Sequence, residues 1–165
     1  MLAEYSTANQ VKQLLSGSTI DFDGVLFDFE KSTADVTIAQ TKRAMANVVR
    51  AGYKVAVTVS NCRPYGWEAT AASKTQFAKA WGRDPNVSFY SPQMYGSGET
   101  YATIGNCQPA DWGMLANFKA PIVPATPRLS DVEDYFNLGL EESGNPGAAA
   151  TADIPAREAI AWHEC

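Results

Sequence analysis

Two carboxylates stand at the end of an apolar run near the amino terminus. Residues 22–29 are rich in apolar and β-forming side chains, which predicts a strand that carries Asp28, and Glu30 follows directly. Since alternate residues of a strand share a face, Leu26, Asp28 and Glu30 point the same way. Like charges this close raise a pKa within such a pair, which suits general acid–base catalysis. Strand-end acids also cap helices or pair with surface lysines, and that structural interpretation stands beside the catalytic one.

The surrounding chain alternates apolar runs with helix-like segments. The spacing predicts helices over residues 6–16, 34–50, 70–81 and 130–138, the second capped by Thr33 and followed by Gly52. It predicts strands over 22–29, 54–60, 87–95 (interrupted by Pro92), around 122–123 and over 159–162. This alternation indicates an α/β fold of parallel β/α units in one domain, residues 1–165. The carboxyl ends of such strands are where these folds place their chemistry.

Composition excludes several classes of function. With 165 residues, 45% hydrophobic and 19% charged, the chain has enough apolar material for a core, and it contains no apolar stretch of the ~20 residues that cross a bilayer. A net charge of −5 argues against nucleic acid as a ligand. The three cysteines lack metal-type spacing, and the single histidine excludes a histidine-cluster metal site.

Three motifs in chain order carry a resemblance to a known family. Residues 23–30, DGVLFDFE, resemble the Asp-Gly-x-Asp-x-Asp-x-Glu signature of glycoside hydrolase family 18, which includes chitinases; Leu26 departs from it, since the family usually has Asp there. Residues 91–95, SPQMY, are similar to the end of that family's sixth barrel strand, and residues 159–162, AIAW, to its eighth. The resemblance covers about residues 20 to 165.

The resemblance implies a fold and a way of completing it. The chain looks like strands four to eight of a TIM barrel, an incomplete barrel in which strands one to three have no counterpart. A closed barrel needs roughly 200–250 residues. Exposed strand edges are costly, so we expect a partner chain, a second copy or the rest of a longer protein to cover them.

The resemblance also implies an activity, with no cofactor and no metal. A family 18 enzyme cleaves β-1,4-linked N-acetylglucosamine polymers with retention, using the substrate's own acetamide as nucleophile. Glu30 would be the acid/base and Asp28 the group that orients the acetamide. Tyr95 and Gln93 would hydrogen-bond that acetamide, and Trp162 would stack under the sugar.

Other residues allow two interpretations each. Tyr65 and Trp67 follow the strand at 54–60, and Trp112 follows the next strand; they are either outer sugar subsites or ordinary loop packing. Cys62 and Cys107 fall on loops after neighbouring strands, where they either form a disulfide or remain free thiols. A disulfide and a polysaccharide substrate fit a secreted protein, although the amino-terminal residues show no signal-peptide pattern.

Two alternatives to an active glycosidase remain. Because leucine cannot share a proton with Asp28, Leu26 also fits an inactive carbohydrate-binding or structural module of the same fold. The segment from Asp21 to Leu26 also resembles motif one of the haloacid dehalogenase-like phosphatases, in which Asp21 would be the nucleophile, Asp23 the acid/base, and Mg²⁺ would bridge them to phosphate. The residues before Asp21 are too short and polar a run for the strand that this phosphatase site requires.

Overall fold

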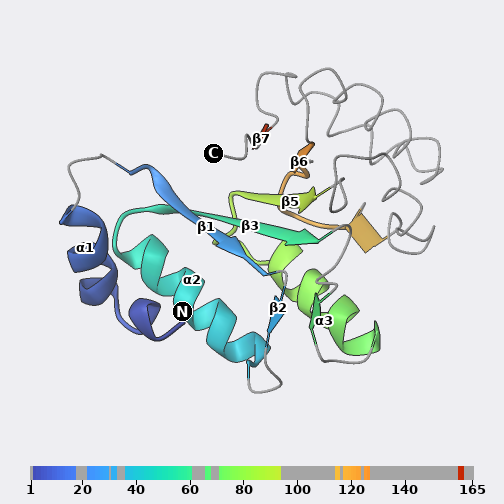
Figure 1. Cartoon of the computed structure of the whole chain (residues 1–165), viewed down its shortest axis with the longest axis horizontal. Coiled ribbons are helices and arrows are strands. Elements are labelled where there is room, and N and C mark those ends of the chain that lie inside the picture. Colours follow the sequence, from blue (N-terminus) through green and yellow to red (C-terminus); the bar gives the residue numbers. More distant parts are fainter. Residues whose placement is uncertain are drawn as a thin grey trace.

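A parallel sheet forms the centre of the molecule. The structure is a computed structural model, and it describes residues 2–17, 22–29, 31–32, 36–60, 66–67, 71–93, 114–115, 117–123, 125–126 and 160–161. The strands of the sheet are β1 (Gly24–Asp28), β3 (Lys54–Ser60), β5 (Phe89–Gln93), β6 (Ala125–Thr126) and β7 (Ile160–Ala161). They lie side by side in this order, and every pairing is parallel. The order in space therefore follows the order in the chain without a reversal (Figure 1). The predicted α/β fold of parallel β/α units is confirmed.

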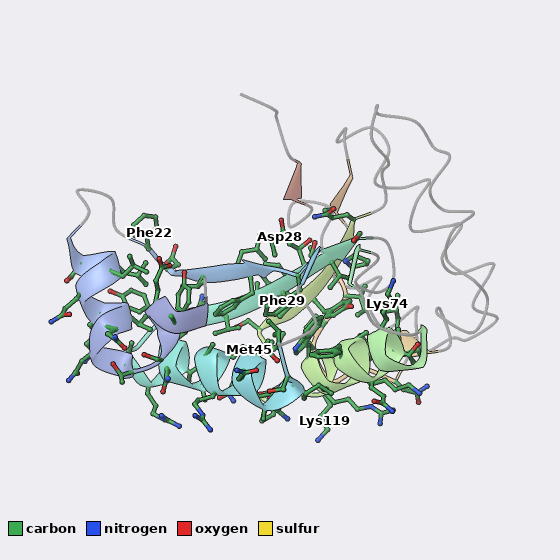
Figure 2. All side chains as sticks on the ribbon, turned by 60° about the horizontal axis from the view of Figure 1, so that its bottom comes forward. Phe22, Asp28, Phe29, Met45, Lys74 and Lys119 are labelled. Carbon is green, nitrogen blue, oxygen red and sulfur yellow. The ribbon has the colours of Figure 1, made fainter. Side chains whose placement is uncertain are left out.

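The helices that connect these strands lie on one face of the sheet. α2 (Ile38–Arg50) joins β1 to β3, and α3 (Ala71–Gly82) joins β3 to β5. The 3₁₀ helix η1 (Leu2–Tyr5) and α1 (Ala8–Ser16) precede β1 and pack against α2. Right-handed crossovers that advance in one direction place every connecting helix on the same face, as Figure 2 shows for α2 and α3. In the part of the chain that the structure describes, the opposite face carries no helix; we call it the helix-free face.

The core lies between the sheet and these helices. Its members include Phe27, Phe29, Met45, Val48, Val55, Val57, Val59, Phe77, Trp81 and Tyr90. Trp81 is fully buried, with its ring 4.3 Å from that of Phe29, and its Nε1 donates a 2.8 Å hydrogen bond to Thr41 Oγ1. The Tyr5 ring packs edge-on against the Phe27 ring, with 5.0 Å between the ring centres. Burial of the Tyr5 hydroxyl raises its pKa, and the nearby negative charge of Glu4 adds to this effect. Two apolar layers therefore meet across one face of the sheet.

The start of α2 differs from the prediction. The helix begins at Ile38 rather than at residue 34, and its cap is Thr37 rather than Thr33. Thr37 Oγ1 accepts from the Gln40 amide at 3.2 Å, and Gln40 Oε1 accepts from the Thr37 amide at 2.7 Å. This reciprocal pair satisfies two amides that have no partner within the helix. At the other end, Gly52 has a φ of 98°, which fits the predicted glycine just past the helix.

Pro92 does not interrupt its strand, contrary to the prediction. It lies inside β5, opposite Val59. The Tyr90 amide donates to Pro121 O at 2.9 Å, and the Tyr90 carbonyl accepts from the Val123 amide at 3.0 Å. Both backbone groups of Tyr90 therefore point toward the side of β5 on which β6 lies. By alternation the Pro92 nitrogen points the same way, and the pairing of β5 with β3 loses no donor.

Other elements were not predicted from the sequence, and one predicted helix lies outside the described residues. β2 (Lys31–Ser32) and β4 (Gly66–Trp67) form a second, two-stranded parallel sheet that no hydrophobic pattern predicts. At the strand expected around residues 122–123 the structure has a parallel bridge between Tyr90 and Ile122, and β6 lies at residues 125–126. The helix expected over 130–138 lies outside the described residues. No helix among those described has the length and apolar character to cross a membrane.

Candidate functional site

Asp28 ends β1 with its side chain on the helix-free face. Phe27 and Phe29, on either side of it, are 4% and 6% exposed and point into the core, whereas Asp28 is exposed. Figure 2 shows the same division, with Asp28 on the side of the sheet away from α2, and Phe29 between the sheet and the helices. Leu26 shares the face of Asp28 and is half-buried. The carboxylate therefore stands at the carboxyl edge of a parallel sheet, where such folds place their sites.

Two hydroxyl side chains continue from Asp28 across the sheet. Asp28 lies in register with Thr58 of β3, and Thr58 in register with Ser91 of β5. In-register residues of parallel strands share a face and lie about 4.8 Å apart. Asp28, Thr58 and Ser91 thus form one polar row, and Ser60 and Gln93 form the next pair toward the carboxyl ends.

The polar row is charged at one end and buried at the other. Thr58 is 1% exposed and Ser91 is fully buried, and neither hydroxyl has a hydrogen-bond partner. Gln93, one pair further on, is 6% exposed. Asp28 has an interaction partner of its own. The row therefore joins an exposed carboxylate to two hydroxyl groups that solvent does not reach.

Glycine is required at the amino end of the same strand. A Cβ at Gly24 would lie 2.5 Å from the backbone oxygen of Lys54, so β1 and β3 approach too closely there for any side chain. The glycine of the DGVLFDFE segment therefore has a packing reason, since it lets β1 pair with β3 in the register that places Asp28 beside Thr58.

The structure describes part of the predicted site. Asp28 and Gln93 lie on the same face of the sheet, two strands apart. Trp67 lies in β4, a strand described by its backbone. The remaining predicted residues, Glu30, Tyr65, Tyr95, Trp112, Trp162, Cys62 and Cys107, lie outside the described residues. By sequence, Glu30 follows Asp28 by two residues and Trp162 follows β7 directly.

Sequence reasoning missed Thr58 and Ser91 as site residues. The sequence places each in a strand and gives neither a role in the sugar site. The available signal was the position of a lone hydroxyl inside an apolar run, in step with Ser60 and Gln93 two residues later. Recognising it requires the register between strands, which the sequence does not give.

Asp23, one of the two aspartates of the phosphatase hypothesis, lies at the amino-terminal edge of the sheet. Asp23 is exposed at the amino end of β1, where its carbonyl accepts from the Lys54 amide at 3.0 Å, and Asp21 lies outside the described residues. Doubly wound sheets bind ligands at the carboxyl ends of their strands, where the strand order reverses, and this order contains no reversal. Among the residues that the structure describes, no group of three His, Cys, Asp or Glu side chains could hold a metal ion.

Comparison of the whole chain with protein-family models, with curated proteins and with solved structures finds no match.

Proposed function

We propose that this chain is a chitinase-like glycoside hydrolase that cleaves β-1,4-linked N-acetylglucosamine polymers with retention. One observation carries the proposal. Asp28 presents an exposed carboxylate on the helix-free face at the carboxyl end of a parallel strand, in a row with Thr58 and Ser91. This is where the DGVLFDFE segment needs its second acid if Glu30 is to act beside it.

The strand order supports a barrel-like arrangement in this proposal. A doubly wound sheet reverses its strand order and carries helices on both faces, whereas this sheet advances in one direction with α2 and α3 on one face (Figure 1). In a β/α barrel the face without helices is the interior. Within the described residues, β1 pairs with β3 alone, so a partner chain or second copy that completes a barrel would add its strands beside β1.

The proposed reaction assigns one step to each group. Glu30 gives a proton to the glycosidic oxygen as the carbonyl oxygen of the substrate's acetamide attacks C1 and the C1–O bond breaks. The Asp28 carboxylate orients the acetamide N–H and stabilises the positive charge of the cyclic intermediate. Water then attacks C1 and breaks the bond between C1 and the acetamide oxygen. Glu30 takes a proton from this water, which regenerates the acid. Gln93 and Tyr95 hold the acetamide carbonyl, and Trp162 stacks under the pyranose.

Release of product from a chromogenic N-acetylglucosamine oligomer tests the proposal. We expect Glu30→Gln and Asp28→Asn to lower kcat by about 10²-fold or more, since each removes a group that acts on the reacting atoms. Asp23→Asn is the matched control, because Asp23 is an exposed carboxylate at the other end of the same strand. Turnover that survives in Glu30→Gln contradicts the assignment.

A second function, sugar binding without catalysis, is favoured by one specific observation. Leu26 lies on the face of Asp28, where the related signature has an acid, and it can neither donate nor accept a proton. A protein that binds the oligomer in a calorimetric titration, and that releases no product in wild-type form, is such a binding module.

A further inference from the structure

Thr58 and Ser91 each bury a hydroxyl group without a hydrogen-bond partner. Thr58 Oγ1 and Ser91 Oγ are both shielded from solvent, so water does not satisfy them in this conformation. Buried polar side chains in folded proteins almost always have a partner, and an unpaired one costs free energy. Two such groups at adjacent positions of one sheet face require a common explanation.

The register of the sheet places a partner within reach of each hydroxyl. Thr58 lies between Asp28 and Ser91 in the polar row, with each neighbour about 4.8 Å away across the sheet. A threonine or serine hydroxyl donates one hydrogen bond and accepts others, and its position changes with a single rotamer step. Rotations of these side chains therefore suffice to join Ser91 to Thr58 and Thr58 to the carboxylate.

We propose that Ser91 donates a hydrogen bond to Thr58 and that Thr58 donates one to the Asp28 carboxylate, which makes Thr58 a positioning residue for Asp28. An ionised carboxylate accepts about four hydrogen bonds, so this bond adds to the interaction that Asp28 already makes. The chain of donors satisfies both buried hydroxyls at once. Its value for catalysis rests on the proposed function, whereas its existence does not.

A hydrogen bond from Thr58 gives Asp28 a donor on a face where Leu26 offers none. A donor to the charged form of Asp28 lowers its pKa and fixes its orientation, and Leu26 offers no donor. Among the described residues of β1 and β3 on this face, Lys54 is the ionisable side chain besides Asp28, and it lies at the amino end of β3, opposite Gly24. Glu30, which lies outside the described residues, follows Asp28 by two residues in the sequence.

The pKa of the Asp28 carboxyl, followed by carbon-13 NMR without substrate, tests the chain. We expect Thr58→Val to raise it by about 0.5–1 unit, because the charged form loses a donor. Thr58→Ser should leave the pKa near its wild-type value, since the hydroxyl is retained. Ser91→Ala should raise it by less than Thr58→Val, because Ser91 acts through Thr58.

Thermal unfolding of the same variants supplies the opposing result. If the hydroxyls are bonded, Thr58→Val lowers the unfolding midpoint. An unchanged Asp28 pKa with a raised midpoint overturns the proposal, because removing a buried unpaired hydroxyl stabilises a protein. Product release, measured separately, distinguishes the two proposals: a shifted pKa in a protein without turnover retains the hydrogen-bond chain and discards the glycosidase.

Discussion

Leu26→Asp restores the acid that the resembling signature has and this chain lacks. Leu26 and Asp28 share the helix-free face of β1, two residues apart. At the rise of a strand their side chains start about 6.6 Å from each other. If the proposed function is correct, a carboxyl at position 26 shares a proton with Asp28 and supports its change of role during the reaction.

The size of the effect follows from this separation. Two charges about 6.6 Å apart interact by about 0.6 kcal/mol in bulk water and by about 2.5 kcal/mol at an effective dielectric near 20. These energies correspond to an increase in the pKa of the pair of about 0.5–2 units and to a change in rate of about threefold to about seventyfold. Because Asp28 is exposed, we expect values nearer the lower limits. The half-buried Leu26 loses apolar contact, which lowers the free energy of unfolding by about 1 kcal/mol.

Hydrolysis of the chromogenic oligomer across pH is the assay. We expect Leu26→Asp to raise kcat, and we expect the limb of the pH profile that reports the carboxylate pair to move to higher pH. Leu26→Asn has nearly the same shape but cannot exchange a proton, so it should gain nothing. Equal gains in both variants would refute the proton-sharing argument, and a loss in Leu26→Asp with intact folding would refute the resemblance at this position.

Three further predictions concern the scaffold, each measured by urea unfolding. Thr37→Ala should lower the free energy of unfolding by about 1 kcal/mol, because it removes the α2 cap, whereas Thr37→Ser should preserve it. Thr41→Val should cost about 1–3 kcal/mol, because the buried Trp81 Nε1–H loses its 2.8 Å acceptor, and the cost should shrink when Trp81→Phe is already present. Gly24→Ala should cost about 1–3 kcal/mol, because the added methyl would lie 2.5 Å from the Lys54 carbonyl oxygen, and a neutral result would contradict the close approach of β1 and β3.

Periodicity predicted the main helices and strands because each buries apolar side chains in one core between the sheet and its helices. β3 coincides with the predicted 54–60, since a run rich in β-branched residues suits a strand between two neighbours. The predicted start of α2 was wrong because the sequence offers two threonines, Thr33 and Thr37, as the N-cap. Thr37 is the cap because Gln40, at the third helical position, completes a capping box with it. β2 and β4 were missed because two-residue strands carry no period.

The site could be predicted along a strand but not across the sheet. Alternation within 22–29 placed Asp28 opposite to Phe27 and Phe29, and the structure shows that division. Thr58 and Ser91 became visible through the register of β1, β3 and β5, which depends on how closely the backbones approach at Gly24 and on the packing of the helices behind the sheet. Cross-strand register is a property of the folded chain, which no local pattern encodes.

The core of this protein is what aims its carboxylate. Phe29 stacks on Trp81 at 4.3 Å and Phe27 packs against Tyr5 at 5.0 Å, so the helix-covered face of β1 fits one register. A slip of one residue would turn Asp28 toward Trp81 and expose both phenylalanines, because successive side chains alternate between faces. Burying an unpaired carboxylate and exposing two aromatic rings are both costly, which makes that slip unfavourable. The same contacts that stabilise β1 thus hold Asp28 beside Thr58, and any function of the helix-free face depends on apolar residues that never touch a ligand.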